Sequence, residues 1–280
     1  MDVDVERDLV KHLRDPAPLR AVVHHPRNHG VTRAKWGHGY ERLDATTGRL
    51  TRLAGLTPLL ERVYWSSDKP APAPARRGVK RAREPAPLPG GVANGGIMGA
   101  VRGAVRGTIV HEQAHDLVTL SADALKRRCP QRHAWSEAVV HALLDHHVLP
   151  AAGNVPAYVE ALGLCTEIDL LGVEEPSGHL VVVEIKTGYS GGAWRASRGP
   201  MRGVLAGVLD DTPLNRALVQ VMVATLLLVE GHAVAGGRID AWVIHVDERG
   251  ARRHVLGPEF MAHYGPLVVR ELALHARSKG

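Results

Sequence analysis

Two short stretches of the chain decide its fold class: Thr166-Glu-Ile-Asp-Leu-Leu-Gly172 and Val181-Val-Val-Glu-Ile-Lys-Thr-Gly188. Runs this rich in apolar and β-branched residues predict strands, over residues 164–171 and 180–186. The intervening sequence Glu174-Glu-Pro-Ser-Gly178 is typical of a turn. We therefore expect the two strands to pair as a hairpin.

Charged side chains lie at one end of this hairpin. Side chains alternate along a strand, so Glu184 and Lys186 share one face while Val183 and Ile185 take the other. The turn places Asp169 opposite Val183 or Glu184. Two carboxylates and an ammonium group then converge at one edge of the sheet, after an apolar run in which charges are costly without a purpose.

Such a cluster suits phosphodiester hydrolysis. Carboxylate oxygens are hard ligands that Mg²⁺ prefers, and Mn²⁺ can substitute for it. The metal lowers the pKa of a bound water and stabilises charge in the transition state. Lys186 can position or deprotonate that water, or stabilise the developing charge. The plain alternative is a Glu-x-Lys pair that is merely solvated at a strand end.

The chain after residue 99 alternates between helical and strand patterns. The expected elements are helices over 105–118 and 134–148, a short helix between Ser121 and Pro130, a long apolar helix between Thr212 and Gly231, and a strand over 239–246. Strands followed by helices predict an α/β fold in which helices pack against a mixed sheet. Residues 50–63 also have helix-compatible spacing.

Changes in composition divide the chain into three sections: an accessory region over 1–65, a Pro/Ala/Gly-rich basic linker over 66–96, and the main domain over 97–280. The linker carries five basic residues within eight: Arg76, Arg77, Lys80, Arg81 and Arg83. Such a block is typical of a nuclear-import signal or a phosphate-binding arm, and a plain soluble linker is the alternative. Four histidines of the first section are irregularly spaced, which predicts solvated or packing roles for them: His24, His25, His29 and His38.

Charge and composition limit which partners the protein can bind and in which cell compartment we expect it. The formal net charge is +6 and the pI about 9.6, which favours a polyanion. Aromatic residues make up only 4% of 280 residues, so a nucleic acid should be held mainly through its phosphates. The longest apolar run is broken by Gln220, and the acidic N-terminus is unlike a signal peptide. With only two cysteines, we expect an intracellular protein without a membrane span, nuclear if the basic block is an import signal and otherwise cytoplasmic.

An Asp, a variable spacer and then Glu-x-Lys after an apolar strand resembles the signature of the PD-(D/E)XK nuclease superfamily. The sequence around it resembles the RecB-like and lambda-exonuclease-like branch, which includes viral alkaline exonucleases. In that branch an upstream helix carries Gly-x-x-x-His, matched here by Gly107-Thr-Ile-Val-His111, and a later helix carries a Gln, matched by Gln220. The Tyr that usually follows this Gln by four residues is Ala224 here. The resemblance covers residues 100–246.

The resemblance implies a restriction-endonuclease-like core, which is a central mixed β-sheet flanked by helices, with an N-terminal extension. It implies a set of ligands for Mg²⁺: His111, Asp169, Glu184 and the backbone carbonyl of Ile185. Lys186 is then the catalytic lysine, and Gln220 orients it or a phosphate. Arg102 and Arg106, one helical turn apart, are candidate phosphate contacts, with a solvated face as the alternative. Glu137 is a weaker candidate for the site, with an exposed surface position favoured.

The function implied is a metal-dependent DNA nuclease. The branch favours an exonuclease that acts at DNA ends in replication, recombination or repair, together with a single-strand-annealing or replication partner. A structure-directed or restriction-type endonuclease is the alternative. The oligomeric state is left open.

A competing motif overlaps the same helix. His111-Glu-Gln-Ala-His115 has the HExxH pattern of zinc proteases, for which Glu137 offers a third ligand. Asp116 follows the second His, where an uncharged residue is usual, and a protease leaves the Glu-x-Lys cluster without a role. A nucleic-acid-binding module that has lost catalysis is the third class, although it has no reason to keep Asp169, Glu184 and Lys186. Metal identity separates the three classes. Dependence on Mg²⁺ indicates the nuclease, tightly held Zn²⁺ the protease, and indifference to chelators the binding module.

Overall fold

A computed structural model of the chain describes residues 31–33, 40–43, 47–65, 99–189, 191–232 and 238–277. The basic linker lies outside these residues, as do His24, His25, His29 and His38 and the side chain of Arg102.

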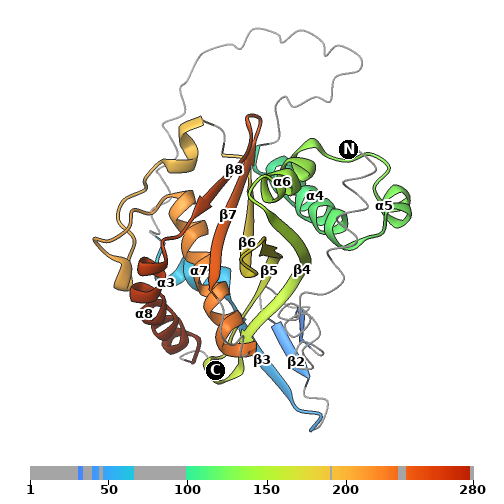
Figure 1. The fold of residues 1–280 in the computed structure, drawn as a ribbon. Coiled ribbons are helices and arrows are strands. Elements are labelled where there is room, and N and C mark those ends of the chain that lie inside the picture. The colour runs from blue at the N-terminus through green and yellow to red at the C-terminus, as the bar shows by residue number, and fades with distance from the viewer. Residues whose placement is uncertain are drawn as a thin grey trace.

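The described residues form an α/β fold built on one mixed sheet, as predicted (Figure 1). Its eight strands are β1 (Val31–Arg33), β2 (Tyr40–Leu43), β3 (Leu50–Gly55), β4 (Val148–Val159), β5 (Leu164–Glu174), β6 (His179–Thr187), β7 (Ile239–Asp247) and β8 (Gly250–Val255). The helices are α3 (Leu56–Val63), α4 (Gly99–Thr119), α5 (Ala122–Arg128), α6 (Ala134–Leu144), α7 (Pro213–His232) and α8 (Pro258–Arg277).

The β5–β6 hairpin lies at the centre of the sheet. β4 pairs antiparallel with β5 along its whole length, and β7 pairs parallel with β6 before turning back into β8. The N-terminal strands β1, β2 and β3 form an antiparallel ribbon whose last strand joins the start of β5 in parallel. Part of the section expected to be accessory is therefore built into the main sheet.

Helices cover both faces of this sheet (Figure 1). On one face α4 and α6 bury residues such as Val110 and Leu143 against Val183 and Ile185. On the other face α3, α7 and α8 form a larger core. The alternation of β6 thus directs Val183 and Ile185 to the α4 face and leaves the intervening residues, among them Glu184, on the α7 face.

The ends of two helices follow the predicted capping. Ser121 Oγ accepts the backbone N–H of Ala124 at the start of α5, and Thr212 Oγ1 accepts that of Asn215 at the start of α7. By length and composition alone α7 is apolar enough to cross a membrane, with a mean hydropathy of 1.4 over Pro213–Gly231. Half of that window is buried inside the protein.

Three local predictions were wrong. Residues 50–55 are strand rather than helix, because they find strand partners in β2 and β5. The helix expected over 134–148 ends at Leu144, and the chain then forms the unpredicted β4. Gly231 lies inside the last turn of α7 rather than after it. A Cβ there would lie 2.0 Å from Tyr158 O, so the glycine permits close packing of the helix on β4.

Candidate functional site

Asp169 lies where the β5–β6 hairpin opens. The ladder between the two strands ends at Leu170 and Val183. One residue further, Asp169 Oδ2 accepts a hydrogen bond of 2.7 Å from the backbone N–H of Ile185. The carboxylate therefore satisfies a backbone donor just beyond the paired region and is held in place by it.

Glu184, Lys186 and Gln220 form a hydrogen-bonded triangle. Lys186 Nζ donates to Glu184 Oε1 at 2.5 Å and to Gln220 Oε1 at 3.2 Å. Gln220 Nε2 donates to the same Glu184 Oε1 at 2.7 Å. Because Gln220 comes from α7 and the other two from β6, the face-covering helix contacts both charged residues of the Glu-x-Lys motif.

His111 reaches the site from α4, the helix on the opposite face. Its Nδ1 lies 3.3 Å from Asp169 Oδ1, and both side chains are partly exposed. The helix can approach because a Cβ added to Gly107 would lie only 3.0 Å from Thr187 Oγ1. In the Gly-x-x-x-His pattern, Gly107 thus permits close packing of α4 on β6, and His111 places a ring nitrogen at the site one helical turn later.

The site concentrates opposite charges in a half-buried position. Burial and the neighbouring Asp169 raise the pKa of Glu184 to about 7, against the opposing influence of Lys186 and His111. Burial would also raise the pKa of Asp169, but His111 and Lys186 hold it below its usual value. Burial would lower the pKa values of His111 and Lys186, and the two carboxylates raise both instead. Of the two carboxylates, only Glu184 has a raised pKa. A cation bound beside it would stabilise its charged form.

The donor chemistry of this site fits a divalent cation. Cis donors on a six-coordinate ion with bonds of about 2.1 Å lie about 3 Å apart, close to the 3.3 Å between His111 Nδ1 and Asp169 Oδ1. Glu184 instead turns Oε1 toward Lys186 and Gln220. Within the described residues the three acidic and histidine side chains do not all approach within 4.8 Å of one another. Binding by all three therefore requires their donor atoms to lie closer together than they do in this structure.

Other predicted residues lie elsewhere. The Arg106 guanidinium packs over the Trp135 ring at 4.3 Å, so it contacts α6 rather than the carboxylates. The side chain of Glu137 is partly exposed and lies 3.8 Å from Arg132. Ile185, by contrast, lies at the site through its backbone, because its N–H donates to Asp169 Oδ2, while its side chain is buried on the α4 face.

The two histidines of the HExxH pattern face different carboxylates. His115 Nδ1 lies 3.6 Å from Asp116 Oδ1, while His111 faces Asp169. The His115 ring packs on Gly153 of β4, where an added Cβ would lie 2.4 Å from its Cδ2. In the described part of the chain no third donor joins this histidine pair in a compact set.

One residue beside the site was missed. His245 is 1% exposed and pairs in register with Lys186 across β6 and β7. Its Nε2 lies 2.5 Å from Gly188 O, and its ring stacks on Trp194 with centroids 4.2 Å apart and planes 8° apart. It therefore holds the backbone immediately after the Glu-x-Lys motif. The available signal was a single His within the apolar run of residues 241–246.

Comparison of the sequence with protein-family models and with curated proteins finds no match. Function must therefore be inferred from the chemistry of the site.

Proposed function

We propose that this chain is a Mg²⁺-dependent nuclease that hydrolyses phosphodiester bonds in DNA. The observation that supports it most is the convergence of Asp169, Glu184 and Lys186 at the open end of the β5–β6 hairpin. Helices on opposite faces of the sheet bring His111 and Gln220 to the same point. Two carboxylates, an ammonium group and an imidazole in a partly exposed position are the groups that metal-assisted hydrolysis requires.

The residues divide into metal ligands and charge stabilisers. Asp169, Glu184 and His111 would hold Mg²⁺, with the carbonyl of Ile185 as a further ligand. When bound, the ion supplies Lewis acidity and lowers the pKa of the attacking water. Because the carboxylates raise its pKa, Lys186 keeps its proton at neutral pH. It would therefore serve as a fixed positive charge toward the phosphate rather than as a general base.

DNA is the proposed substrate, and a DNA end the proposed point of attack. The net charge of +6 supports a polyanionic substrate. The preference for ends, a role in replication, recombination or repair, and a single-strand-annealing or replication partner follow from the resemblance of the motif. A structure-directed endonuclease uses the same groups and differs only in how DNA reaches them.

Digestion of end-labelled linear, nicked and covalently closed DNA tests this proposal, with Mg²⁺ and with chelator. We expect loss of linear DNA that needs Mg²⁺ and is absent in Lys186→Met. Lys126→Met is the matched control, because Lys126 is exposed on α5. Intact closed circles indicate an exonuclease and cut circles an endonuclease. A folded wild-type chain that cleaves none of the three would refute the nuclease.

A further inference from the structure

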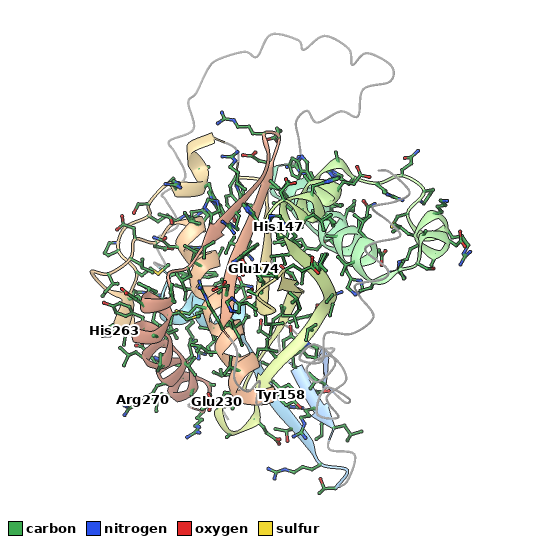
Figure 2. The ribbon with its side chains drawn as sticks, in the orientation of Figure 1. His147, Tyr158, Glu174, Glu230, His263 and Arg270 are labelled. Carbon is green, nitrogen blue, oxygen red and sulfur yellow. The ribbon has the colours of Figure 1, made fainter. Side chains whose placement is uncertain are left out.

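A second group of potential metal ligands lies at the other end of the central strands. Glu174 ends β5, His179 begins β6, and Asp240 stands near the start of β7. One donor atom from each lies within 4.8 Å of the other two, and all three side chains are half-buried. Figure 2 labels Glu174 near the middle of the molecule. His179 is separated from Lys186 by seven residues of β6, or about 23 Å along the strand, so this group is distinct from the proposed active site.

His179 has an unfulfilled ring nitrogen that points to a ligand. Its Nδ1 is buried, and within the described residues it has no hydrogen-bond partner. Glu174 Oε2 lies 3.6 Å from it, within ion-pair range but too far for a hydrogen bond. A buried nitrogen without a partner is costly, and a bound cation would satisfy it.

The two carboxylates are already oriented by neighbours. Ser177 Oγ donates to Glu174 Oε2 at 2.8 Å, and Arg238 Nε donates to Asp240 Oδ1 at 3.0 Å. Each contact uses one lone pair of one oxygen, so both carboxylates keep lone pairs for another ligand. Hydrogen bonds of this kind fix the ligands of a metal site before the metal arrives.

The separation of the Glu174 and His179 donors suits a four-coordinate ion. A tetrahedral ion with bonds of about 2.0–2.2 Å holds two donors about 3.3–3.6 Å apart, which matches the 3.6 Å between His179 Nδ1 and Glu174 Oε2. One imidazole nitrogen and two carboxylates are donors that Zn²⁺ binds in four-coordinate sites. We infer that Glu174, His179 and Asp240 bind one Zn²⁺, with water as the fourth ligand. The ion would link the ends of three adjacent strands.

Zinc titration of the full chain, stripped with chelator, tests this site independently of the proposed nuclease. The variant used for the titration carries Asp169→Asn and Glu184→Gln, so that the proposed active site does not contribute to Zn²⁺ binding. We expect one Zn²⁺ per chain by calorimetry and a Tm that rises by about 5–10 °C at free Zn²⁺ near 100 times Kd. Co²⁺ in place of Zn²⁺ should give the strong visible absorption of a four-coordinate site.

Adding His179→Ala should weaken Zn²⁺ binding at least about 100-fold, since losing only an outer hydrogen-bond partner already costs 10- to 100-fold. Asp240→Asn keeps the side-chain shape and should give a comparable loss if His179→Ala does not fold. His263→Ala is the control, because His263 is exposed on α8, away from the cluster (Figure 2). No Zn²⁺ binding in the parent chain, or equal binding in all variants, would overturn the inference.

Discussion

Replacing Gln220 with Met tests the contact between α7 and the catalytic strand. The side chain is 9% exposed, and Met preserves its length and most of its volume, so the core should stay packed. The change removes the hydrogen bonds to Lys186 Nζ and Glu184 Oε1 and leaves the direct Lys186–Glu184 contact intact.

The size of the effect follows from these two bonds. A hydrogen bond to a charged group contributes about 1.5–3 kcal/mol. If one such contribution is lost from the transition state, kcat falls about 10- to 150-fold. KM should change little if Gln220 acts through Lys186 and Glu184, the two side chains that it contacts.

Steady-state cleavage of saturating end-labelled duplex with Mg²⁺ measures this effect. Thr225→Val is the matched control, because Thr225 is buried on the same helix and bonds only within it, to Val221 O. A kcat for Gln220→Met within about twofold of wild type would refute the proposed coupling. Equal losses in both variants would assign the effect to helix packing.

Four further outcomes are expected. Lys186→Met should lower kcat at least about 10³-fold while circular dichroism and Tm stay near wild type. His111→Ala should raise the Mg²⁺ concentration needed for cleavage and His115→Ala should not, whereas equal loss of bound zinc in both, with cleavage unaffected, would favour the protease. A backbone N–H and an arginine hold the pKa of Asp247 below its usual value despite burial, so its contribution is present above about pH 4 and is lost as pH falls through the lowered pKa. Denaturant unfolding should find Asp247→Asn less stable by about 1–3 kcal/mol at pH 7, with the gap closing toward pH 2–3. Burial raises the pKa of Cys165, so it should react with a thiol reagent only on unfolding, and rapid labelling of native protein would contradict its burial.

The hairpin that carries the site could be predicted because its signals are local. The apolar runs, the turn and the alternation of Glu184 and Lys186 all lie within 23 residues, from 166 to 188. The approach of His111 and Gln220 could not be derived from spacing, since it depends on how two helices dock. Both were identified through resemblance to a motif, and the structure brings both to the hairpin.

β4 was missed because its own sequence argues against a strand. Pro150, Gly153 and Pro156 interrupt it, and such residues are rare in central strands. β4 pairs only with β5, so prolines are tolerated on its open side, and Gly153 makes room for His115. His245 lies in a strand that was predicted correctly, but its role was missed. A single polar residue in an apolar strand indicates no function until its neighbours in the fold are known.

The parallel pairing of β3 with β5 has a consequence for synthesis of the chain. It joins Ala54 to Leu164 and Gly55 to Cys165, positions 110 residues apart. Closing a loop of that length costs about 4 kcal/mol of entropy, whereas the β5–β6 hairpin closes through a short turn. At about 5–20 residues per second, the ribosome needs roughly 5–20 s to deliver β5 after β3. The edge of β3 that pairs with β5 must therefore stay unpaired in the cell for that time, and it can pair with strands of other chains. Although β1, β2 and β3 leave the ribosome early, they are among the last strands to join the sheet.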